Sequence, residues 1–129
     1  MGKRLFDKGM EAYKEAQVYA DDSIRAVCTK WDADELEKRA SPALKGTASK
    51  EQMRRLMEQC KAKLGALKTI GEHTQPQFHA GATTGSGAFQ TVGMVVSATF
   101  EKGTADIRIT VVKSGDSWQI NEFHVNWPL

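Results

Sequence analysis

Two side chains of the sequence could transfer protons to or from a bound substrate. Tyr13 falls near the apolar stripe of the first expected helix, and Glu122 falls at a break in the alternation of the last expected strand. A positioned tyrosine and carboxylate are typical of general acid–base catalysis, as in isomerases and dehydratases. A lone tyrosine is more often a core residue with a hydrogen-bonded hydroxyl. Because the other inward positions of the strands are apolar, we expect no catalytic set.

The two cysteines could form a covalent crosslink. Cys28 and Cys60 lie 32 residues apart, each on the apolar stripe of an expected helix. Helices pack 8–10 Å apart, and a disulfide requires Cα atoms about 4.4–6.8 Å apart. Free cysteines are also among the most buried residues. The sequence therefore leaves open a disulfide or two buried thiols, but with no CxxC pattern and no adjacent histidine it indicates no metal site.

The three histidines are separated along the chain. His79 and His124 alternate with Phe78 and Phe123, so we expect them, like His73, at the surface. Zinc requires three or four convergent ligands. The stretch 85–87 is glycine-rich, but no helix follows it to complete a phosphate-binding loop. We therefore expect no metal and no cofactor.

Length and charge exclude several classes of protein. The chain has 129 residues and a net charge of +2, which indicates a single domain, residues 1–129. Residues 45–68 carry a local charge of +5 but no aromatic side chain, which indicates a solvated helix face and no nucleic-acid partner. No apolar run approaches the length of a membrane span. Residues 1–4 are basic, but no apolar signal region follows them, so we expect a cytoplasmic protein or a mature secreted domain.

Hydrophobic periodicity predicts three helices in a helical part that covers residues 7–72. The first spans residues 7–31, with apolar residues at three- and four-residue spacing. Asp32 caps a short second helix that ends before Pro42, and residues 46–47 form a loop. Ser49 and Gln52 form a capping box for the third helix, which contains Gly65 and ends at Gly71.

Alternation predicts four strands in a sheet part that covers residues 76–127. The apolar face contains Phe78, Ala80 and Ala82, then Val92 to Phe100, Ile107 to Val111, and finally Trp118 and Ile120. Phe123, Val125 and Trp127 are out of phase with Trp118 by one residue, so we predict a β-bulge at residues 121–122. The opposite face is a candidate partner surface, with small and β-branched residues and little charge: Val95, Thr99, Arg108, Thr110 and Val112.

These elements predict an α+β domain. Three helices, each with one apolar stripe, precede an antiparallel four-stranded sheet with one apolar face. We expect the twisted, bulged sheet to curve and the helices to pack in its concave face.

Several short segments resemble those of a known fold. They are Trp31, residues 40–45, residues 49–52, Leu64-Gly65, and the closing Trp118-Gln119-Ile120 with Phe123. Their order over residues 24–127 resembles bacterial secreted domains of the cystatin-like, nuclear-transport-factor-like superfamily, although Met53 stands where such domains often have Trp. The resemblance implies a cone fold and a periplasmic or secreted setting, and that setting favours the disulfide between Cys28 and Cys60. It implies no activity.

Three hypotheses follow. The first is a non-catalytic extracytoplasmic domain that binds a small ligand or a protein at the mouth of the cone or on the outer sheet face. The second is an isomerase- or dehydratase-like enzyme that uses Tyr13 and Glu122. The third is an assembly module that acts through the outer sheet face, for example as a homodimer.

Overall fold

The computed structural model describes the backbone of residues 2–83, 87–114 and 117–126, and the side chains of residues 13–73, 91–113 and 117–126. The described elements are four helices followed by four strands: α1 (Gly2–Cys28), α2 (Ala33–Arg39), α3 (Pro42–Thr47), α4 (Lys50–Leu64), β1 (Leu67–Thr83), β2 (Gly87–Phe100), β3 (Gly103–Ser114) and β4 (Ser117–Asn126). The expected α+β class, helices first and sheet second, is confirmed.

The strands form one antiparallel sheet in the order β1-β2-β3-β4, so β1 and β4 are its edges. Side chains of one face are buried, among them Val96, Ile107, Ile109 and Ile120 at 0% exposure. This alternation arises because successive residues of a strand point to opposite faces. The sheet therefore has one core face and one outer face.

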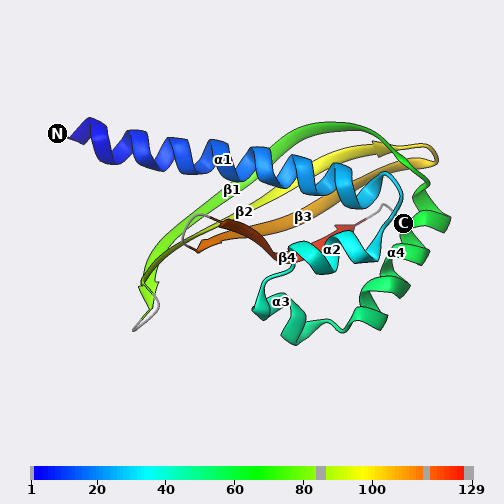
Figure 1. Ribbon diagram of the computed structural model, residues 1–129. Helices are drawn as coiled ribbons and strands as arrows, with labels where there is room; N and C mark the ends of the chain where they lie inside the picture. Colours follow the sequence, from blue (N-terminus) through cyan, green and yellow to red (C-terminus); the bar gives the residue numbers. More distant parts are fainter. Residues whose placement is uncertain (1, 84–86, 115–116, 127–129) are drawn as a thin grey trace.

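The helices cover the core face and one end of the sheet. Ala16, Ala20, Ile24 and Val27 of α1 are fully buried in the same apolar cluster as the core-facing strand residues. Figure 1 shows α1 running alongside the strands, while α2 and α3 lie next to β4. Within the described residues, no helix is long and apolar enough to cross a membrane.

The predicted β-bulge is present in β4. Thr110 pairs with Glu122, whereas the next residue, Val111, pairs with Ile120, so Asn121 is the extra residue. The bulge changes the phase of the strand, and Ile120, Phe123 and Val125 are consequently all buried. Trp118, at the start of β4, is only partly buried against the core.

The prediction of three helices was wrong. Residues 42–47 form the short helix α3, because Ser41 accepts a hydrogen bond from the Leu44 amide as N-cap and Pro42 occupies the first turn. Pro42 therefore begins a new helix, in addition to opposing the continuation of the preceding one.

The helical part also ends earlier than predicted. Gly65 has a φ of 75° and terminates α4 as its C-cap, so it does not lie inside a helix. Leu67 and Gly71 belong to β1. Leu67 follows Leu64 at helical spacing, so the sequence predicts one continuous helix. In the structure the two side chains pack against the same core but belong to different elements, Leu64 to α4 and Leu67 to β1.

The first helix has different ends from those predicted. It begins at Gly2 and ends at Cys28, whereas we expected residues 7–31. Trp31 adopts a φ of 52°, and the Asp32 amide donates to the Val27 carbonyl, so the chain reverses direction after α1. The side chains of Phe78, His79, Ala80, Ala82 and Trp127 and the turns at residues 84–86 and 115–116 lie outside the described residues.

Candidate functional site

A groove between α3 and the outer face of β3 and β4 is the strongest candidate site among the described residues. It encloses about 650 Å³, within the range of ligand-binding clefts. We call it the α3–β4 groove, and it is lined by Ala43, Leu44, Thr47, Ala48, Arg108, Thr110, Asn121, Glu122, Phe123 and His124.

The wall formed by α3 is held against β4 by the chain that precedes the helix. Ala40 forms a parallel bridge with Ile120, and the Ser41 amide donates to the Ile120 carbonyl at 2.8 Å. The Ser41 hydroxyl also donates to Asn121 Oδ1 at 2.8 Å. Asn121, the extra residue of the bulge, therefore hydrogen-bonds to the N-cap residue of α3. Through this bond the bulge helps to hold the α3 wall of the groove in place.

The strand side of the groove carries both signs of charge. Arg108 and His124 are cross-strand partners, and both side chains are exposed on the outer face. Glu122 lies opposite Thr110, whose hydroxyl donates to Glu122 Oε1 at 3.3 Å. Within the described part of the chain, no ion pair engages Arg108 or His124. The guanidinium is consequently available for an anionic group.

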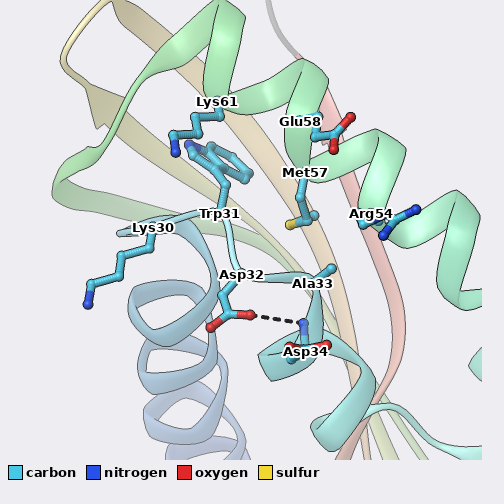
Figure 2. Close-up of a pocket in the computed structure, with 9 residues that line it drawn as sticks. All are labelled: Lys30, Trp31, Asp32, Ala33, Asp34, Arg54, Met57, Glu58 and Lys61. Carbon is cyan, nitrogen blue, oxygen red and sulfur yellow. Dashed lines mark hydrogen bonds between the residues drawn. The ribbon is translucent and has the colours of Figure 1, made fainter.

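A second depression lies where α1, α2 and α4 meet (Figure 2). The buried side chains of Trp31 and Met57 lie beneath it. Its rim has three basic and three acidic residues: Lys30, Arg54, Lys61, Asp32, Asp34 and Glu58. Asp32 is already used as the N-cap of α2, since its carboxylate accepts from the Asp34 amide at 2.9 Å. The rim therefore carries no net charge.

A third depression lies along α1 beside Trp118. It includes Val18, which is 70% exposed, and Tyr19. Its acidic groups already have partners, because Glu15 pairs with Lys113 at 3.5 Å and Asp22 pairs with Arg39 at 3.2 Å. Lys14 and Arg25 of this depression, and Lys30 and Lys61 of the second, also have no ion pair among the described residues, so an unpaired cation does not distinguish the α3–β4 groove. The groove differs from the other two depressions in its walls, which come from a helix and from two adjacent strands of the sheet.

The structure separates the two residues considered for catalysis. Tyr13 packs against the core from α1, on the helix-covered side of the sheet. Glu122 is exposed on the outer face, beside Thr110. The two side chains therefore do not line a common pocket.

The predicted partner surface does face outward. Val95 pairs with Arg108, and its side chain and those of Thr110 and Val112 are partly buried, whereas Thr99 and Arg108 are exposed. Arg108 and Thr110 line the α3–β4 groove, whereas Thr99 and Val112 lie elsewhere on the same face. The sequence analysis missed the other half of the site, which α3 provides. The signal was the pair Ser41-Pro42, an N-cap followed by a residue preferred in the first helical turn.

Of the two histidines whose side chains the structure describes, one differs from the isolated surface residue that we expected. His124 is exposed, as predicted. His73 lies on the core side of β1, and its Nε2 is 2.6 Å from Asp21 Oδ1 of α1. Both side chains are at most 20% exposed, so this pair ties β1 to α1. Among the described residues, no cluster of three or more His, Cys, Asp or Glu side chains could hold a metal ion.

The two cysteines are free thiols with fully buried side chains. Burial raises the pKa of Cys28 far above its usual range, and the neighbouring charge of Cys60 raises it further. Burial also raises the pKa of Cys60, to about 11. Both thiols are therefore protonated at neutral pH, and neither is an activated nucleophile. Both thiols belong to the same buried core cluster.

Comparison with protein-family models, with curated proteins and with solved structures gives no match for this chain.

Proposed function

We propose that this chain is a non-catalytic binding domain that takes a small ligand or a protein segment on the outer face of its sheet, at the α3–β4 groove. The observation that supports this is the exposed Arg108, which has no ion pair among the described residues, in a groove whose size suits a ligand. Arginine binds carboxylates through a planar fork of donors, so an anionic group is the favoured partner.

The helix-covered side of the sheet supports the same proposal. Val92, Val96, Ile109 and Val111 are fully buried beneath helix side chains such as Ile24. These side chains are packed together as a core, and the three depressions described above lie outside it. A ligand therefore has better access to the outer face than to the interior.

We also propose a cystatin-like cone fold and an extracytoplasmic setting. The order of elements and the burial of α1 side chains against the sheet support the fold. For the setting, the support is the resemblance to secreted domains together with the burial of both cysteines in one core cluster.

A thermal-shift screen of anionic small molecules and peptides tests the binding proposal. A ligand at 100 times its Kd stabilises the folded state by about 2.7 kcal/mol. We expect ligands that raise the Tm of the wild-type protein but not of Arg108→Gln. Arg55→Gln is the matched control, because Arg55 is 73% exposed on α4 and its one ion pair among the described residues is with Glu51 at 3.9 Å. Ligands that stabilise all three proteins equally would contradict the groove as the site.

A further inference from the structure

The free edge of β4 already accepts one extended segment of this chain. Ala40 and Ser41 run parallel to the strand and pair with Ile120, after which the chain forms α3 beside β4. The rest of the described edge, residues 122–126, pairs with β3 on one side only. Alternate residues of an edge strand present N–H and C=O groups away from the sheet, where another strand can pair with them.

The groove lies over the outer face of β3 and β4 and reaches α3 at the side of this edge. Its α3 wall is mostly apolar, with Ala43, Leu44 and Ala48 beside Thr47, whereas its strand side carries His124 and Arg108. Successive side chains of an added strand would point alternately to the two faces of the sheet. An acidic side chain on the outer face would lie one strand spacing, about 4.8 Å, from His124, with Arg108 on the next strand.

The charge pattern limits the number of acidic residues in the partner. Glu122 lies two residues before His124 on the same face and accepts a hydrogen bond from Thr110. A second acidic residue two positions along the partner would lie near this carboxylate and be repelled. The groove therefore fits one acidic residue flanked by neutral ones.

We propose that the α3–β4 groove binds an extended segment of a partner protein, which adds to β4 as a fifth strand and places one acidic side chain beside His124 and Arg108. This inference rests on the proposed function and names its partner. The main-chain hydrogen bonds of such an added strand supply affinity, and the side-chain contacts select the sequence.

Fluorescence anisotropy with a labelled pentapeptide, Thr-Val-Asp-Val-Thr, tests the proposal. We expect saturable binding to the wild-type protein and at least tenfold weaker binding when Lys replaces Asp. Arg108→Gln should weaken binding at least fivefold, whereas Arg55→Gln should leave it unchanged. Equal binding of the Asp and Lys peptides would overturn the charge contact.

Backbone N-methylation of the peptide tests strand addition without altering the protein. Two peptides are methylated at alternate amides, in the two possible registers. We expect one of them to lose at least tenfold in affinity, because its methyl groups replace the N–H groups that face β4. If both methylated peptides bind like the parent, the ligand does not add as a strand and the inference is overturned.

The outcomes separate this inference from the proposed function. If the pentapeptide fails to bind but an anionic small molecule stabilises the wild type and not Arg108→Gln, strand addition is wrong and the binding proposal stands. If neither binds, both proposals fail. Self-association that Arg108→Gln abolishes would assign the groove to a second copy of this chain and overturn the peptide inference.

Discussion

The contrast between two tryptophans shows how much one hydrogen bond matters at the residue scale. Trp31 is 5% exposed, its Nε1 donates to the Gly65 carbonyl at 2.6 Å, and its ring stacks on Phe100 with centroids 5.4 Å apart. Nε1 of Trp118 is buried without a hydrogen-bond partner among the described residues. The Trp31 contacts offset a backbone with positive φ, which is rare for a bulky residue.

Trp31→Phe is expected to lower the free energy of unfolding by about 1–3 kcal/mol, because it leaves the buried Gly65 carbonyl without its donor. Trp118→Phe is the matched control and should change stability by less than about 0.5 kcal/mol, since it removes a donor that has no partner. Urea denaturation measures both. Equal losses in the two variants would show that ring packing, and not the hydrogen bond, sets the effect.

The buried thiols predict an alkaline loss of stability in the reduced protein. Cys60 titrates near pH 8.5 when unfolded but at about 11 when folded, so the folded state retains its proton more tightly. This stabilisation is complete below pH 8.5 and is lost as the pH rises toward 11. The stability of Cys28→Ala/Cys60→Ala should therefore fall less steeply over this range in denaturant melts. Identical slopes for the variant and the wild type would contradict the burial of these thiols.

At the element scale, the periodicity of apolar residues was sufficient to predict the β-bulge but not the ends of the helices. The run from Trp118 to Val125 changes phase by one residue, and only an inserted residue restores a common face, so the bulge could be predicted. The end of α4 could not be predicted in this way, because Leu64 and Leu67 have the same spacing whether they share a helix or belong to adjoining elements. Gly65 decides the outcome, since its backbone has positive φ and Glu101 Cβ lies 3.1 Å from the position of an added Cβ.

Ser41 links the end of one element to the bulge of another, which predicts a larger mutational effect than that of an ordinary cap. Ser41→Ala removes the N-cap of α3 and the hydrogen bond to Asn121, so we expect a loss of about 2 kcal/mol. Ser49→Ala, the control, removes only an exposed cap, with an expected loss of about 1 kcal/mol. Chemical denaturation compares them, and a smaller loss for Ser41→Ala would show that α3 is not held by this contact.

Cys28 lies on α1 and Cys60 on α4, both as free thiols in this structure, and we expect the pair to be oxidised in an extracytoplasmic protein. A disulfide closing a loop of about 30 residues stabilises the fold by roughly 3–4 kcal/mol in the chain-entropy estimate. Protein purified without reductant should therefore contain no free thiols when unfolded, and its Tm should fall on reduction. Two free thiols in that assay would contradict the disulfide and weaken the proposed setting, because cytosolic thiols remain reduced.

At the scale of the whole molecule, the sequence predicted the class of fold and half of the candidate site. Alternation identified Arg108 and Thr110 as outward-facing residues, because facing depends only on local periodicity. The groove could not be predicted, because its other wall, α3, meets the sheet through a contact between Ser41 and Asn121, 80 residues apart in sequence. The separation of Tyr13 from Glu122 is likewise a property of the assembled sheet.

The central claim is that ligands bind on the outer face while the helix-covered face remains a packed core. Methyl-resolved NMR, on addition of the tightest ligand from the thermal-shift screen, tests this claim most directly. Leu44 and Thr110 provide methyl groups in the α3–β4 groove, and Ile24 and Ile109 provide methyl groups in the core. We predict that the Leu44 and Thr110 signals shift and that the Ile24 and Ile109 signals do not. Shifts confined to Ile24 and Ile109 would place the ligand inside the fold and contradict the account.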